Sequence, residues 1–80
     1  MTTSKKLDLV GTLNRLAGTF NLGALGAANA WAGTKNLGLL GALNAKAGTK
    51  NQDFNQVCNT LASTTNLEGL HALHLLAGID

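Results

Sequence analysis

Residues 33–47 read GTKNLGLLGALNAKA, and this fifteen-residue unit recurs without a gap along most of the 80-residue chain. The other copies are residues 18–32 (GTFNLGALGAANAWA), 48–62 (GTKNQDFNQVCNTLA) and 63–77 (STTNLEGLHALHLLA), with residues 3–17 (TSKKLDLVGTLNRLA) as a divergent first copy. A unit this short cannot bury an apolar face alone and must pack on its neighbours. Residues 1–80 are therefore predicted to form one repeat domain.

Each copy predicts one short helix followed by a turn. A glycine follows the last alanine of the periodic stretch at Gly18, Gly33, Gly48 and Gly78, as expected for the left-handed residue that ends a helix. Ser63 takes this place in the fourth copy, which makes that junction the least regular. We expect helices of ten or eleven residues, joined by turns of about four, in an all-α compact array or a short α-solenoid. A serine, Ser4, lies near the start of the first helix, and acidic residues fall in the first turn of three helices, at Asp8, Asp53 and Glu68.

A helical wheel divides the third copy into an apolar arc and a strip of small residues. The arc holds Leu37, Leu39, Leu40, Leu43, Asn44 and Ala47. The strip holds Gly38, Gly41 and Ala45, and its counterpart in the second copy holds Gly23, Gly26 and Ala30. Glycine inside a helix costs about 1 kcal/mol relative to alanine, so close approach of another backbone is the best reason for it. These six residues are predicted protein–protein contacts; a poorly formed glycine-rich loop is the alternative.

A row of asparagines occupies equivalent places in four copies, at Asn14, Asn29, Asn44 and Asn59, and His74 takes the fifth place. A buried amide must be hydrogen-bonded, so we predict that each asparagine bonds a turn of the adjacent copy and sets the register of packing. A row of ligand-binding asparagines is the alternative.

The fourth copy departs most from the pattern, since Gln52 and Asn55 stand where the third copy has leucines. Its narrower apolar stripe predicts a helix at an edge of the assembly. Cys58 takes a place that is leucine in three other copies, and we predict a buried, unreactive thiol. Trp31, on the predicted apolar arc of the second copy, is either core or the aromatic anchor of a partner interface, and we include it among the predicted interface residues.

Little in the sequence supports catalysis or a cofactor. Charged residues are 12% of the chain, and the six Lys and Arg residues are spread along it rather than clustered, which disfavours a nucleic-acid surface. No signal peptide is visible and no apolar run is long enough for a membrane span. His71 and His74 have only Glu68 near them in sequence, so we predict no metal site, no cofactor and no enzyme activity.

The run LNRLAGT, followed after one residue by NLGALGAANAWAGTKNLGLLGALNAKAGT, resembles repeats carried by small virion proteins of tailed bacteriophages, particularly those infecting actinobacteria, and by segments of their larger head or tail proteins. The resemblance covers nearly the whole chain and is weakest over residues 51–65. It implies a structural role and supplies no catalytic residues. The expected function is a minor capsid or decoration protein that binds the major capsid or another virion protein and self-associates. Its expected location is the virion, after assembly in the host cytoplasm.

Three other functions fit the same features. A phage tail component is one, and a small solenoid adaptor that binds a peptide or helix in a concave groove is another. A designed consensus repeat is the third, although the irregular fourth copy and the free Cys58 count against design.

Overall fold

The computed structural model describes residues 7–79 and contains one α-helix in each copy. The helices are α1 (Leu9–Ala17), α2 (Ala24–Ala32), α3 (Leu39–Ala47), α4 (Phe54–Ala62) and α5 (Gly69–Ala77). The prediction of an all-α fold of five short helices is confirmed. Each helix has nine residues rather than ten or eleven, so the connections are longer than predicted. Ser4 lies outside the described residues.

The helices begin later than the sequence suggests. Gly23 and Gly38, predicted inside helices, are instead the N-caps of α2 and α3 and have extended backbone. Asp8, Asp53 and Glu68 are likewise N-caps rather than first-turn residues. The physical reason is that an N-cap residue lies outside the helix while its carbonyl already accepts the first intrahelical bond, and periodicity alone does not distinguish it from a helical residue.

The helices end as predicted. Gly18, Gly33, Gly48 and Gly78 all have left-handed backbone, with φ between 71° and 78°. Ser63 adopts the same conformation, with φ 61°, so the fourth junction follows the others despite its side chain.

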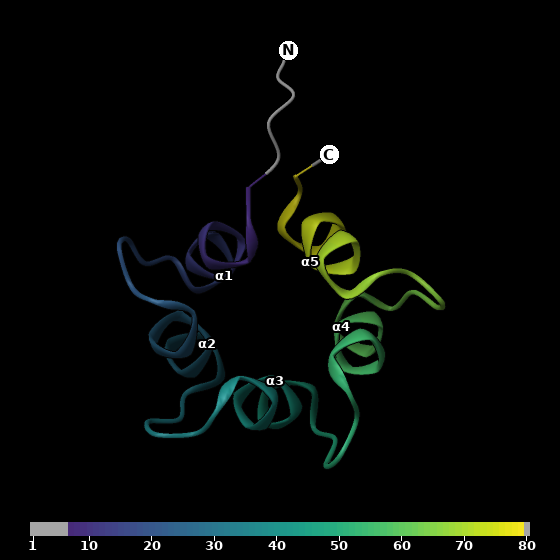
Figure 1. Ribbon diagram of the computed structural model, residues 1–80, viewed down its shortest axis with the longest axis horizontal. Coiled ribbons are helices and arrows are strands. Elements are labelled where there is room, and N and C mark those ends of the chain that lie inside the picture. Colours follow the sequence, from purple (N-terminus) through teal and green to yellow (C-terminus); the bar gives the residue numbers. More distant parts are fainter. Residues whose placement is uncertain (1–6, 80) are drawn as a thin grey trace.

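The five helices form a closed ring, with the connections on its outside (Figure 1). The molecule measures 37 × 29 × 14 Å, and a nine-residue helix is about 14 Å long, so each helix spans the thickness of the disc. α1 packs against α5 as well as against α2, which closes the ring. The predicted edge position of the fourth copy is therefore wrong: α4 packs between α3 and α5.

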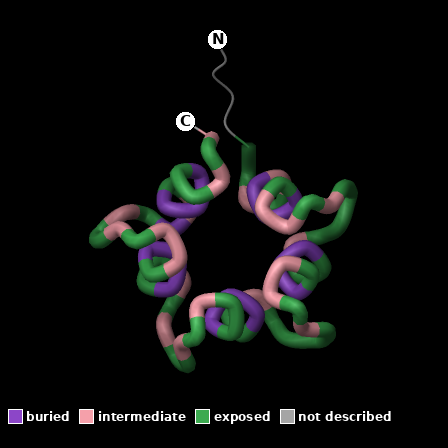
Figure 2. The backbone as a smooth tube through the Cα atoms, turned by 180° about the vertical axis from the view of Figure 1, so that it is seen from behind, coloured by how far each residue is buried: buried purple, intermediate pink, exposed green. Residues whose placement is uncertain are grey.

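The core lies on the inside of the ring, where each helix has two consecutive, fully buried residues (Figure 2). All of them except Thr12 belong to a single apolar cluster. These pairs are Thr12 and Leu13, Ala27 and Ala28, Ala42 and Leu43, Val57 and Cys58, and Ala72 and Leu73. The residues four positions before and three positions after the second residue of each pair lie on the same face of the helix. Several of them, such as Leu39 before Leu43, pack against the cluster.

The apolar arc predicted for the third copy is therefore rotated. Leu39 and Leu43 face the core as predicted, but Leu37 and Leu40 are 41% and 43% exposed. Ala42, which was assigned to neither face, is completely buried. Small side chains let the five helices approach closely around the centre of the ring. The position of Ala42 is at this centre, so alanine rather than leucine fits there.

A small residue of α5 packs against a large residue of α4 in the core. A Cβ atom on Gly69 of α5 would lie 2.6 Å from Cδ2 of Phe54 of α4, so this glycine makes room for the ring. At the opposite end of the core, half-buried Trp31 packs against the cluster, and the Lys46 ammonium lies 5.3 Å from its ring centroid. Trp31 is thus partly core and partly surface.

Candidate interaction surface

The asparagine row joins each copy to the next through a repeated set of four hydrogen bonds. Nδ2 of Asn44 donates to the carbonyls of Leu40 (2.8 Å) and Gln52 (3.1 Å). Its Oδ1 accepts from the Gln52 amide (3.1 Å) and the Thr49 hydroxyl (2.6 Å). The amide side chain therefore pairs with both polar groups of one residue, as a second peptide group does in a β-ladder. The same four bonds occur at three other positions, Asn14, Asn29 and Asn59.

This geometry makes neighbouring helices parallel. Asn44 bonds the first turn of its own helix, at Leu40, and also Gln52, which precedes the N-cap of α4. The starts of α3 and α4 therefore lie side by side, and each connection returns along the outside of the ring. The predicted hydrogen bonds from each asparagine to the adjacent copy are present, and the setting of the register by this row stays a prediction. Both N–H groups and both lone pairs of the amide are used, which leaves it nothing to offer a ligand.

His74 closes the ring in place of a fifth asparagine. Its Nε2 lies 2.7 Å from the carbonyl of Leu7, the residue equivalent to Gln52 in the first copy. A carbonyl only accepts, so Nε2 carries the hydrogen. Nε of Arg15 on α1 also donates to the Ala77 carbonyl at the end of α5 (3.3 Å). These two bonds link the last copy to the first.

The predicted small-residue strip lies on the outside of the ring. Its members, Gly23, Gly26 and Ala30 on α2 and Gly38, Gly41 and Ala45 on α3, are all exposed. Cβ atoms on Gly26 and Gly41 would lie 3.4 and 3.3 Å from Cβ of Leu22 and Leu37, so a leucine of the same copy lies beside each glycine. Within the described residues, no atom lies close to the Cβ positions of Gly23 and Gly38. The strip is not used for close backbone approach inside the molecule.

Exposed leucines accompany this strip. We name Leu25, Leu37 and Leu40, which are 54%, 41% and 43% exposed, the leucine band. Leu25 and Leu37 are neighbours, because Asn29 bonds both of their carbonyls. Sequence reasoning assigned Leu37 and Leu40 to the core. The fourth copy has amide residues, Gln52 and Asn55, in place of these two leucines. This was the signal against a core position, since a core position rarely tolerates an unpaired polar group.

A groove runs between the outer face of a helix and the connection that follows it. The groove on α1 has a volume of about 660 Å³ and is lined by apolar, polar and charged side chains, whereas the equivalent groove on α4, of about 460 Å³, is lined mainly by amide and hydroxyl side chains. A smaller groove on α5, of about 270 Å³, is lined by Glu68, Leu70, His71 and His74. The same backbone thus presents different chemistry in different copies.

Cys58 and the two histidines are the candidate nucleophile and metal ligands among the described residues. Cys58 is fully buried as predicted, and desolvation raises the pKa of its thiol to about 12, so it is protonated at neutral pH. Within residues 7–79, no three His, Cys, Asp or Glu residues lie close enough to hold a metal ion. None of the described helices has the length and apolar character needed to cross a membrane.

Comparisons with models of protein families, with curated proteins and with solved structures find no match to this chain. The surface features of the ring are therefore the basis for a functional proposal.

Proposed function

We propose that the protein is a structural, non-enzymatic component of a phage particle, a minor capsid or decoration protein that binds the major capsid protein through the leucine band. The exposure of Leu25, Leu37 and Leu40 on one side of the ring carries this proposal. A cluster of exposed large apolar side chains is typical of a surface that binds another protein.

The leucine band suits a flat, apolar partner surface. Gly23, Gly26, Gly38 and Gly41 are exposed on the same two copies as the leucines and add no side chains, so a partner can approach the backbone there. Burying the exposed half of one leucine contributes about 1 kcal/mol. Three leucines and these exposed glycines therefore supply a modest affinity, which many identical sites on a shell would multiply.

The sequence also supports a structural role, because the repeat resembles those of small virion proteins. The alternative of an adaptor that binds a peptide in a concave face has less support, because the inner faces of the helices form the core. A tail component would use the same leucine band against a different shell protein.

The test replaces two leucines of the leucine band with asparagine, the residue that the fourth copy has at the equivalent position. Asn55 in α4 is equivalent to Leu25 and Leu40, so the double variant Leu25→Asn, Leu40→Asn should fold normally. Particles of the phage that encodes the chain are purified, and the copy number of the protein is measured by quantitative mass spectrometry. We expect many copies of the wild type and up to about thirtyfold fewer of the variant, since about 2 kcal/mol of contact is lost.

Lys50→Ala, an exposed change on a connection, is the matched control and should leave the copy number unchanged. Absence of the wild-type protein from the particles would overturn the proposed location. Equal incorporation of a normally folded double variant would show that the leucine band is not the binding surface.

A further inference from the structure

We propose that the groove on α1 binds the same groove of a second copy of this chain, which forms a two-fold symmetric dimer. This contact uses none of the leucines of the leucine band, which lies on α2 and α3 and their connection, although Gly23 lies at the edge of both surfaces. It assigns the self-association of the protein to one surface with a defined geometry.

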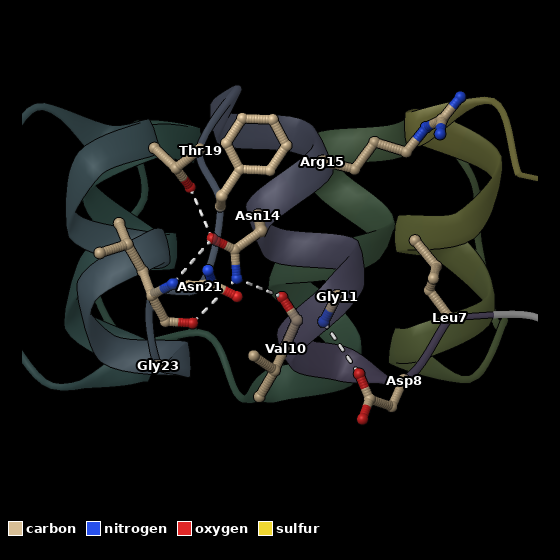
Figure 3. A pocket seen from close by; sticks show the side chains of 11 residues that line it. Leu7, Asp8, Val10, Gly11, Asn14, Arg15, Thr19, Asn21 and Gly23 are labelled. Atoms are coloured by element: carbon tan, nitrogen blue, oxygen red, sulfur yellow. Dashed lines mark hydrogen bonds between the residues drawn. The ribbon is translucent and has the colours of Figure 1, made fainter.

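The groove on α1 has several apolar lining residues and an unusually exposed aromatic ring. The groove lies between α1 and residues 18–23, and its apolar lining residues include Val10, Leu22 and Phe20. Asn14 and Thr19 also line it and are hydrogen-bonded to each other (Figure 3). Phe20 is 86% exposed, more than any other large apolar residue described. The equivalent residues in the later copies are Lys35, Lys50 and Thr65, so the connection folds without an aromatic residue there. Phe20 is thus not needed for the fold of its own connection.

The two ends of the groove carry opposite charges. Asp8 and Arg15 lie at opposite ends of α1 on one face, because seven residues are nearly two turns and rise about 10 Å (Figure 3). One oxygen of Asp8 accepts the Gly11 amide (2.9 Å), and the second oxygen is the one that would meet a partner. Nε of Arg15 donates to Ala77, and its terminal nitrogens carry four more N–H groups.

This distribution is complementary to itself. When two copies face each other across a two-fold axis perpendicular to α1, the two α1 helices run antiparallel. Asp8 of each copy then lies opposite Arg15 of the other, and the apolar side chains of the two grooves meet between these ends. Each Phe20 ring can enter the partner's groove beside Val10 and Leu22. A symmetric interface requires such a self-complementary patch.

The other described grooves lack this combination. In the groove on α4, Thr60 and Thr65 stand in the places of Arg15 and Phe20, and the groove on α5 is lined by two histidines and a glutamate. A typical stable interface buries about 800 Å² per partner, or about one sixth of the 4637 Å² surface of this molecule. One side of the ring is enough for that area.

Charge reversal gives a test that a folding defect cannot imitate. Sedimentation equilibrium of the full chain over a concentration series should show a dimer for the wild type. Asp8→Arg and Arg15→Asp should each weaken dimerisation about tenfold or more, because each places like charges opposite one another at both ends. Mixing these two variants should restore the dimer, since every contact in the mixed pair joins an arginine to an aspartate.

A loop substitution separates this contact from the helix cap. Phe20→Lys copies the residue of the third copy and leaves Asp8 in place, so its thermal midpoint should be unchanged while its dimer weakens. The variant Leu25→Asn, Leu40→Asn should still dimerise, which distinguishes this proposal from the one for the leucine band. A monomeric wild type, or single charge variants that dimerise as well as the wild type, would overturn the proposal. So would a mixture that stays monomeric.

Discussion

Helices α3 and α4 have the same backbone but opposite chemistry on the outside of the ring. α3 begins at Gly38, which makes no side-chain cap bond, and exposes Leu37 and Leu40. α4 begins at Asp53 with a complete capping box, in which Asp53 and Gln56 bond each other's backbone amides (2.9 and 3.2 Å). Both helices nevertheless have nine residues, the same asparagine network and the same buried face. The outer residues of α3 are therefore not required for the fold.

The polar outer residues of α4 are used within the molecule. The Thr60 hydroxyl donates to Oε1 of Gln52 (2.8 Å), and Oδ1 of Asn55 accepts the Gly69 amide at the start of α5 (2.6 Å). Asn55 thereby caps a helix whose own N-cap, Glu68, makes no side-chain cap bond. Leu37 and Leu40 make no such side-chain bonds, and their exposure is the observation on which the proposed binding surface rests.

The largest expected effect on stability comes from the asparagine network, which α3 and α4 share. Asn44→Leu removes four hydrogen bonds and leaves both polar groups of Gln52 without this partner, which should destabilise the domain by about 3 kcal/mol. Asn59→Leu should cost a similar amount despite the polar outer face of its helix. Thermal and urea unfolding of both variants measures this, with Lys50→Ala as the control. A loss at one position only would mean that the network is not a common element of the copies.

A smaller effect should arise where α4 and α5 meet. Gly69→Ala places a methyl group 2.6 Å from Cδ2 of Phe54 and 3.0 Å from Oδ1 of Asn55, so we expect a loss of about 1–3 kcal/mol in the free energy of unfolding. Phe54→Leu, which introduces the residue that α1 and α3 have at this place, should recover part of the loss in the double variant. Additive losses in the double-mutant cycle would contradict this contact.

The ends of the helices give a matched pair of substitutions. Ser63 holds φ 61° with a side chain, whereas Gly33 holds φ 76° without one. Ser63→Gly should stabilise the protein by about 1 kcal/mol, and Gly33→Ser should destabilise it by a similar amount, because a Cβ atom disfavours the left-handed conformation. Equal melting temperatures for both variants and the wild type would show that the left-handed turn carries no such cost here.

The smallest expected change in stability is at the strip itself. Alanine at Gly41 gains up to about 1 kcal/mol of helix propensity, but its methyl would lie 3.3 Å from Cβ of Leu37, which must shift slightly. We expect the free energy of unfolding of Gly41→Ala, and of Gly26→Ala beside Leu22, to change by less than about 1 kcal/mol in either direction. Incorporation into particles should fall if the strip contacts a partner. Normal incorporation of both variants would remove the glycines from the proposed surface.

Much of the fold was predictable because it depends on local signals repeated five times. The glycine after each alanine predicted the helix ends, and the asparagines at fixed spacing predicted contacts between copies. The wheel failed for Leu37 and Leu40 because hydrophobicity does not specify which apolar residues face inward when a helix is short. The predicted starts of α2 and α3 were wrong because Gly23 and Gly38 lack the side chains that usually mark an N-cap.

The sequence by itself therefore determined the number of helices, their ends, the hydrogen bonds of the asparagines and the burial of Cys58, since each depends on residue type and on spacing within one or two copies. Closure of the ring was decided by the tertiary structure. It depends on the angle between successive helices, which small differences in packing set, and on contacts between residues more than sixty positions apart, such as His74 with Leu7. Only the closed ring determines which leucines face outward, and with them the surfaces that are available to a partner.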